Sequence, residues 1–250
     1  MHEFRYKGQK LYCENVPVES IAEKIGTPFY CYSYKAFTER FNALKKAYRP
    51  VKPLICFSVK SNSNSAVIRS LVKKGAGLDI VSEGELFRGL RSGCDPKKIV
   101  FAGVGKTEKE IKAAVKAGIL LFNVESTQEL ELISRVAKNL RKNVDVSIRI
   151  NPDIDAGTHA YITTARAENK FGIDLINAEK IFHARDRYPN VTVCGIHIHI
   201  GSQITKADPF VKAIKKTLRF MKKMEKAGVV FKYLNLGGGL GIVYHKEKVQ

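Results

Sequence analysis

The chain has 250 residues, of which 44% are hydrophobic and 27% are charged, and this composition fits a globular protein with one large core. Its hydrophobic runs are too short to cross a membrane, and its charged start, MHEFRYKGQK, does not resemble a signal peptide. We therefore expect a cytoplasmic protein without a membrane partner. The net charge of +19 arises from lysines distributed along predicted helices. We expect no nucleic-acid partner, because that would require a concentrated basic patch.

The regular part of the chain follows a short N-terminal segment. We expect residues 1–30 to belong to a small β structure and residues 31–250 to form the main domain. In the main domain, short β-rich runs alternate with amphipathic helical runs, a pattern that predicts a parallel sheet with helices outside it. The predicted strands span residues 54–60, 78–81, 99–102, 120–124, 144–150, 193–200 and 233–236.

Seven strands in such units indicate an α/β fold of the (β/α)₈ TIM-barrel type. An open dinucleotide-binding sheet is less favoured, because no glycine fingerprint follows the first strand. Seven strands are one too few to close the barrel, and the two ends of the sheet would be left as unpaired edges. We therefore expect an incomplete barrel and a chain that is part of a longer protein.

The first candidate for chemistry is Lys60, which ends the first predicted strand and precedes a turn of serine and asparagine. Barrels place their chemistry at the carboxyl ends of the strands. Because side chains alternate along a strand, Cys56, Ser58 and Lys60 are predicted to share the face that lines the interior. An amine there can condense with a carbonyl compound. A Schiff-base enzyme is one hypothesis, and a solvated surface lysine is an equally simple interpretation.

A motif in the third predicted element of the barrel resembles a nucleotide-binding loop. FAGVGKTE, at residues 101–108, matches the end of a P-loop, but Val100 stands where the first glycine of that motif belongs. Thr107 is explained by its capping-box spacing with Glu110. We therefore do not expect an ATPase.

Two histidines lie on one face of the sixth predicted strand. His197 and His199 could bind a metal together with carboxylates at other strand ends, such as Asp79, Glu125 and Asp153. They could also be hydrogen-bonded core residues, or one imidazole could stack on a flat cofactor ring. A Gly-Ser turn at residues 201–202 follows directly, and such a turn offers backbone N–H groups and a hydroxyl to an anion.

Three consecutive glycines, Gly237, Gly238 and Gly239, follow the seventh predicted strand. One glycine is enough for a tight turn, whereas three suggest that the backbone approaches a ligand closely. Loops after the late strands of barrels often hold a phosphate group. With Ser202 from the preceding loop, we expect these glycines to form a phosphate cradle.

Taken together, the lysine strand, the histidine strand and the triple-glycine loop resemble the fold-type III pyridoxal-phosphate enzymes. This family of alanine racemase-like barrels includes the basic amino-acid decarboxylases, and the resemblance is strongest to the diaminopimelate decarboxylases. It covers the chain from residue 28 to its end. The matching segments are FSVKSN (57–62), GLDIVSEGEL (77–86), RINPDIDAGTHAYITTARAENKFGI (149–173), HIHIGSQ (197–203) and LNLGGGLGI (234–242).

The resemblance implies pyridoxal 5'-phosphate as the cofactor and no metal. Lys60 would form a Schiff base with the cofactor, and His199 would stack on its pyridine ring. Ser202 and Gly237 to Gly239 would bind the phosphate. The role of Lys170 to Gly172, which belongs to a family motif, does not follow from the sequence.

The resemblance also implies a charged surrounding for the cofactor. Asp79 and Glu85 would lie near the cofactor and the lysine, although Glu85 also has capping-box spacing with Ser82. Arg149, at the end of the fifth predicted strand, would project into the same mouth of the barrel.

The implied reaction is the decarboxylation of meso-2,6-diaminopimelate to L-lysine and CO₂ by a homodimer. The family's Glu-Pro-Gly-Arg segment, and a cysteine and a tyrosine of its C-terminal β domain, do not occur before Gln250. We therefore expect weak or no turnover from these 250 residues alone. Three alternatives stay open: a decarboxylase of ornithine, arginine or carboxynorspermidine, a metal-dependent barrel hydrolase that uses His197 and His199, and a barrel that binds the cofactor without catalysis.

Overall fold

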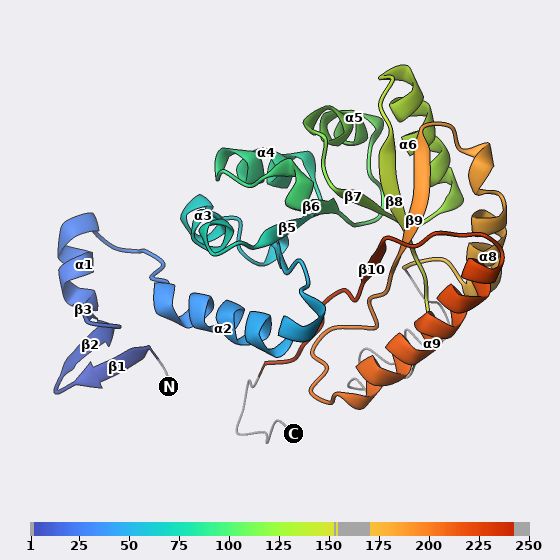
Figure 1. Cartoon of the computed structure of the whole chain (residues 1–250). Coiled ribbons are helices and arrows are strands. Elements are labelled where there is room, and N and C mark those ends of the chain that lie inside the picture. Colours follow the sequence, from blue (N-terminus) through green and yellow to red (C-terminus); the bar gives the residue numbers. More distant parts are fainter. Residues whose placement is uncertain (1–2, 153, 155–170, 243–250) are drawn as a thin grey trace.

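The computed structural model describes residues 3–152, 154 and 171–242. The described residues form two separate sheets (Figure 1). The larger sheet is parallel, with the strand order β10-β9-β8-β7-β6-β5-β4, and it confirms the expected seven-stranded part of a barrel. The smaller sheet is antiparallel and consists of β1 (Phe4–Lys7), β2 (Lys10–Cys13) and β3 (Val16–Pro17).

The seven parallel strands follow one another across the sheet in the order of the chain, because each pairs with the strand that precedes it in the sequence. This order is the result of successive β-α units, in which a helix returns the chain to the starting edge of the next strand. Figure 1 shows that the sheet curls and that helices cover its outer face. The strands are β4 (Cys56–Ser58), β5 (Gly77–Ile80), β6 (Ile99–Phe101), β7 (Leu121–Val124), β8 (Val144–Arg149), β9 (Val191–His197) and β10 (Tyr233–Asn235).

Several of the helices between the strands begin at side-chain caps. The first turn of α5 has the expected capping box, in which Thr107 Oγ1 accepts from the Glu110 N–H at 3.3 Å and the Glu110 carboxylate accepts from the Thr107 N–H at 3.0 Å. Ser82 caps α4 and Ser126 caps α6 with their hydroxyls. The helices are α1 (Val18–Ile25), α2 (Tyr34–Ala47), α3 (Ser65–Lys73), α4 (Glu83–Arg91), α5 (Glu108–Ala117), α6 (Thr127–Asn139), α8 (Leu175–His183) and α9 (Asp208–Lys226).

The hydrophobic core lies between the outer face of the large sheet and these helices. On β7, Phe122 and Val124 are buried in this core, so Asn123 between them points to the inner face. In the same way, Ile196 and Ile198 belong to the core and His197 points inward. The inner face of the curled sheet is therefore lined with polar side chains.

The N-terminal unit contacts the beginning of α2. The Glu14 carboxylate accepts hydrogen bonds from Ser33 Oγ at 2.7 Å and from the Lys35 N–H at 2.8 Å. Lys35 also forms an ion pair with Glu3, with 3.3 Å between Nζ and the carboxylate. This arrangement fits the small β structure expected at the start of the chain, whereas the domain boundary at residue 30 stays a prediction.

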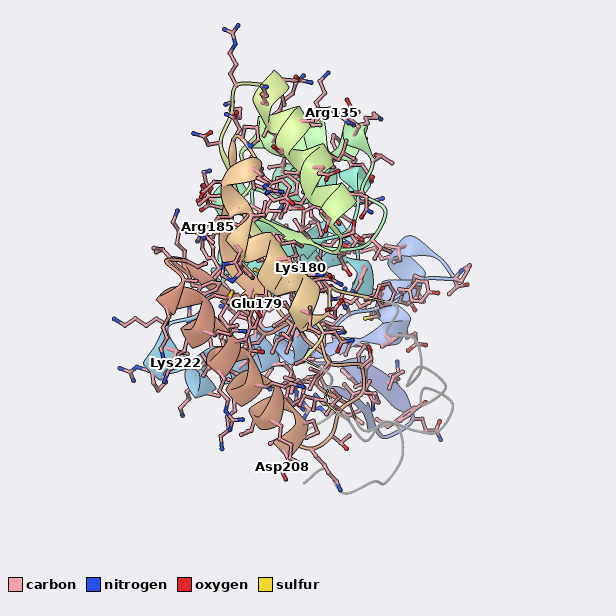
Figure 2. All side chains as sticks on the ribbon, turned by 90° about the vertical axis from the view of Figure 1, so that its right-hand side faces the viewer. Arg135, Glu179, Lys180, Arg185, Asp208 and Lys222 are labelled. Atoms are coloured by element: carbon pink, nitrogen blue, oxygen red, sulfur yellow. The ribbon has the colours of Figure 1, made fainter. Side chains whose placement is uncertain are left out.

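The outer helices carry much of the positive charge. Figure 2 shows charged side chains on α6, α8 and α9 that point away from the barrel, among them Arg135 and Lys222. One of these side chains, Lys223, pairs with Glu179 across α9 and α8 at 2.7 Å. The basic residues of these helices thus lie on solvated faces. No helix within the described ranges is long and apolar enough to cross a membrane.

The first strand of the barrel ends earlier than predicted. β4 ends at Ser58, and Lys60 lies in the following 3₁₀ turn, Val59–Ser61. The turn is favoured because Ser61 Oγ donates a hydrogen bond to the Ser58 carbonyl at 2.7 Å. Lys60 is therefore not the last inward-facing residue of a strand. It lies just beyond the carboxyl end of β4, and it is exposed rather than buried.

Candidate functional site

A layer of polar side chains fills the inside of the curled sheet below its carboxyl end. Asn123 of β7 accepts hydrogen bonds at Oδ1 from Ser147 Oγ of β8, at 2.5 Å, and from Asn235 Nδ2 of β10, at 3.5 Å. Two strands separate β7 from β10. Their side chains can meet only because the sheet curls, and this curl brings the carboxyl ends of distant strands around one space.

Lys60 follows β4 directly, and Asp79 lies on the neighbouring strand, β5. The Asp79 carboxylate accepts a hydrogen bond from Ser58 Oγ at 3.0 Å. Burial raises the pKa of Asp79, and the Ser58 hydrogen bond and the nearby charge of Lys60 oppose this rise. In the part of the chain that the structure describes, no ion pair or side-chain hydrogen bond of Lys60 is present. Its amine is therefore near a carboxylate but not engaged by it.

Glu85 has a structural role that is clear from its contacts. Its carboxylate accepts a hydrogen bond from the Val81 N–H at 2.8 Å, and its own N–H donates to Ser82 Oγ at 3.2 Å. Burial raises the pKa of Glu85, Asp79 raises it further, and Lys60 lowers it. Glu85 therefore fixes the start of α4 while its carboxyl stays within electrostatic range of Lys60.

Arg149 forms an ion pair at the end of β8. Its guanidinium donates to the Glu125 carboxylate, and the exposed fractions of the two side chains are 12% and 3%. The Gly172 N–H donates to the other oxygen of Glu125 at 3.2 Å. The Arg149 guanidinium also lies over the Phe171 ring, 5.2 Å from its centroid. Arg149 thus lies at the expected edge of the sheet, but Glu125 occupies part of its hydrogen-bonding capacity.

Lys106 was not predicted as a functional residue from the sequence. Its side chain is 1% exposed, and its Nζ donates to the Glu129 carboxylate at 2.6 Å, to the Gly103 carbonyl at 2.7 Å and to the Asn123 carbonyl at 2.9 Å. Three acceptors match the three hydrogens of an ammonium group. The only sequence signal was the GKT tripeptide after the strand, which resembles a nucleotide-binding loop but serves here to hold β6, β7 and α6 together.

Both histidines of the HIHIG motif are kept neutral. His197 is 5% exposed, and burial together with the positive charge of Arg149 holds its pKa well below the ordinary value. The pKa of His199 is lowered for the same two reasons. β9 ends at His197, so His199 lies in the segment that follows rather than within the predicted strand 193–200.

The glycine loop after β10 packs closely against the segment after β9. A Cβ atom on Gly237 would collide with the Ile198 carbonyl oxygen, and one on Gly239 would collide with the Gly201 carbonyl oxygen. Both glycines also have positive φ, 68° and 96°, a region that other residues rarely adopt. At Gly237 and Gly239 the loop backbone approaches other atoms closely, and these atoms belong to protein backbone.

Gly238 differs from its neighbours because a Cβ atom there would meet nothing within 4 Å. Its N–H donates to His199 Nδ1 at 3.3 Å, which orients the imidazole and leaves the proton of the neutral ring on Nε2. Ser202 is exposed in the neighbouring turn. The structure thus brings Gly238, His199 and Ser202 to one side of the barrel end.

The metal site of the alternative hydrolase hypothesis is not assembled by the described residues. No group of three or more histidine, cysteine, aspartate or glutamate side chains within those ranges could hold a metal ion. Glu125, a candidate ligand, is bonded to Arg149. Asp153 and Lys170 lie outside the described residues, as does most of segment 149–173.

We expect the buried Lys106–Glu129 pair to contribute far more to stability than an exposed pair of similar length. Replacing Lys106 by Met should destabilise the protein by about 3–5 kcal/mol, because Glu129 would stay buried without its partner. The control is Lys109→Met, which breaks a 2.9 Å pair with Glu83 whose side chains are 82% and 39% exposed. We expect Lys109→Met to destabilise the protein by less than about 1 kcal/mol. Urea unfolding measures both, and equal losses would contradict this assignment.

The depressed pKa of His197 predicts that acid destabilises the fold. In the unfolded chain histidine binds a proton near pH 6.5, whereas the folded protein resists protonation until a lower pH. The unfolded state therefore binds more protons below about pH 6.5, and stability falls as the pH decreases through that value. Between pH 7.5 and pH 5.5, the His197→Asn variant should lose less unfolding free energy than the wild-type protein. An unchanged pH dependence would contradict a neutral, buried His197.

Comparison with known proteins identifies the family. Residues 34–250 match the family described as "Pyridoxal-dependent decarboxylase, pyridoxal binding domain". A curated diaminopimelate decarboxylase from Neisseria meningitidis is 46% identical over 239 residues, which make up 96% of this chain and 58% of the relative. Another from Haemophilus influenzae is 43% identical over 247 residues, or 99% of this chain and 60% of the relative. The chain thus spans less than two thirds of the length of either relative.

Solved structures have the same fold. Diaminopimelate decarboxylase from M. jannaschii, in co-complex with L-lysine, has a TM-score of 0.90 and 36% identity over 98% of this chain and 58% of that one. The enzyme of the same name from Helicobacter pylori, complexed with L-lysine, has a TM-score of 0.88 and 38% identity over 93% and 59% of the two chains. The match over residues 34–250 and these identities establish that the chain belongs to the pyridoxal-dependent decarboxylases and carries their pyridoxal-binding domain.

Proposed function

We propose that this chain is the cofactor-binding part of an enzyme that uses pyridoxal 5'-phosphate to decarboxylate meso-2,6-diaminopimelate to L-lysine. The observation that carries the proposal is the position of Lys60, an exposed amine without an ion-pair partner in the described structure, at the sheet end that also holds His199 and the glycine loop. The names of the relatives, two of them solved with L-lysine, support this choice of substrate.

The residues present fit the phosphate of the cofactor. The space in front of Gly238 is free of protein atoms within 4 Å of a Cβ position, while its neighbours are packed against the Gly201 segment. Ser202 offers an exposed hydroxyl next to that segment. Glycine backbone and a hydroxyl are donors that bind phosphate without adding bulk. We therefore assign the phosphate to the space in front of Gly238, bordered by Ser202, Gly237, Gly238 and Gly239. The Gly237 and Gly238 N–H groups already donate to Asn235 and His199, so the glycines would contribute mainly the room for the phosphate.

The other proposed roles follow from charge and position. Pyridoxal phosphate, when bound, supplies an aldehyde and a conjugated ring that can accept the electron pair left by a departing carboxylate. Lys60 would hold the aldehyde, since its amine is exposed and is not neutralised by a direct contact. His199, neutral and oriented by the Gly238 N–H, would lie against the flat ring without adding a positive charge.

Three charged residues would tune this site. Asp79 and Glu85 both lie within electrostatic range of Lys60, so they would place negative charge beside the proposed nucleophile when ionised. Arg149, bonded to Glu125, would contribute positive charge near the two histidines. In this proposal these residues form the charged surrounding of the cofactor rather than bind its phosphate.

The whole protein would supply what these residues do not. We propose that the complete enzyme is a cytoplasmic homodimer in which residues 1–30 join a β domain and residues 31–250 form most of the barrel. In this proposal the 250 residues alone would turn over substrate weakly or not at all, because they span only 58% and 60% of the two curated relatives.

The substrate is tested by measuring the products of the protein extended through the C-terminal β domain. We expect it to release CO₂ and L-lysine from meso-2,6-diaminopimelate, and to act less well on ornithine and arginine. Lys60→Ala should reduce turnover by roughly 10³-fold or more, because it removes the proposed nucleophile. The control Lys109→Ala changes an exposed lysine on α5 and should leave turnover intact. Near-normal turnover in Lys60→Ala, or a preference for ornithine, would contradict the proposal.

The phosphate site is tested with Gly238→Ala. Nothing lies within 4 Å of the added methyl group, so the unfolding free energy should change by less than about 0.5 kcal/mol. The methyl would enter the space assigned to the phosphate, and we expect the affinity for pyridoxal phosphate to fall about tenfold, or 1.4 kcal/mol. Gly84→Ala, on the exposed side of α4 with only Ser82 Oγ near it at 3.9 Å, is the control. Equal affinities of the two variants would exclude this cradle.

A further inference from the structure

Two buried nitrogen atoms inside the curled sheet have no hydrogen-bond partner among the described residues. They are Asn123 Nδ2 on β7 and His197 Nδ1 on β9. Asn123 is fully buried, and His197 is 5% exposed. Buried polar groups in proteins are almost always hydrogen-bonded, so each exception calls for a specific explanation.

The two atoms belong to the same polar layer. Asn235 connects them, because its side chain donates to Asn123 Oδ1 at 3.5 Å and its backbone lies opposite His197 in the pairing of β10 with β9. Ser147 donates to the same Asn123 oxygen. These two hydrogen bonds to Oδ1 fix the orientation of the Asn123 amide. Its Nδ2 hydrogens then point to another part of the polar layer.

The chemistry of the two atoms decides what they bind. An amide nitrogen only donates hydrogen bonds, so Asn123 Nδ2 cannot be a ligand for a metal ion. An anion is disfavoured as well, because Lys106 and Arg149, two of the nearby cations, are already paired with Glu129 and Glu125, and burial lowers the pKa of His197. The remaining small ligand is one that can accept from an amide and also donate to an imidazole.

We propose that a single buried water molecule bridges Asn123 Nδ2 and His197 Nδ1 inside the barrel. The water accepts one hydrogen bond from the amide and donates one to Nδ1. This direction is favoured because the water would otherwise accept from both nitrogens and leave its own hydrogens to be satisfied elsewhere. Buried water normally makes two to four such contacts.

The bridge has a consequence for His197. When Nδ1 accepts a hydrogen bond, the proton of the neutral ring lies on Nε2, and His197 offers an N–H donor inside the barrel. It also explains why the HIHIG motif has a histidine at position 197, below the site proposed for the cofactor. This inference does not depend on the proposed function, since it concerns only atoms of the polar layer.

The inference is tested in the protein extended through its C-terminal β domain, without added cofactor. In protein labelled with ¹⁵N-histidine, the His197 signals, assigned by their loss in His197→Gln, should show a pyridine-like Nδ1 and a pyrrole-like Nε2. Asn123→Leu removes the amide at similar size, and the Nδ1 signal should move. Thr217→Val is the control, because Thr217 Oγ1 is also buried and unpartnered but lies on α9, and it should not move the signal.

A high-resolution crystal structure of the same wild-type protein gives an independent measurement. We expect one water oxygen within about 3.2 Å of both nitrogens. A protonated Nδ1 would overturn the proposal. So would a metal ion or anion at this position, or direct protein partners for both atoms. If Asn123→Leu does not fold, the proposal is still tested by the His197 tautomer and by the electron density between the two nitrogens, both measured on the wild-type protein.

Discussion

The site depends on the alternation of side chains along a curled parallel sheet. Every second residue of a strand faces the helices and must be apolar, and the residues between face inward, where they are free to be polar. β7 and β9 illustrate this division, because Asn123 and His197 each lie between residues of the hydrophobic core. A shift of one residue in the register of either strand would exchange the two sets. The stability of the core therefore fixes which polar groups meet inside the barrel.

Pairing of the buried charges separates Lys60 from the other basic groups at this end of the sheet. Lys106 is saturated by Glu129 and two carbonyl oxygens, and Arg149 is bonded to Glu125. Both pairs lie beside the polar layer, and each neutralises a charge that would be costly to bury alone. Lys60 lies beyond its strand and, in the described part of the chain, lacks such a partner. This contrast, rather than the number of lysines in the chain, supports its proposed role.

The order of the strands and the nature of the fold could be predicted from the sequence, because alternating β-rich and helical runs are local patterns. The ends of β4 and β9 were predicted too late. A hydroxyl–carbonyl hydrogen bond of Ser61 ends the first strand, and an apolar run does not reveal such a contact. Lys106 was missed because its acceptors come from its own loop, from β7 and from α6, which are brought together only by the fold. The triple glycine predicted a ligand loop, which stays a prediction, and the sequence did not reveal that two of its three positions are also required by contact with the neighbouring backbone.

The most direct measurement of the central claim is the chemical identity of the lysine that holds the cofactor. The protein would be incubated with pyridoxal phosphate, reduced with borohydride, digested and mapped by mass spectrometry. The account predicts one stable cofactor adduct, on the peptide that contains Lys60, which the Lys60→Ala variant should lack. A single adduct on another lysine would contradict the account. So would adducts scattered over the exposed helix lysines with none at Lys60.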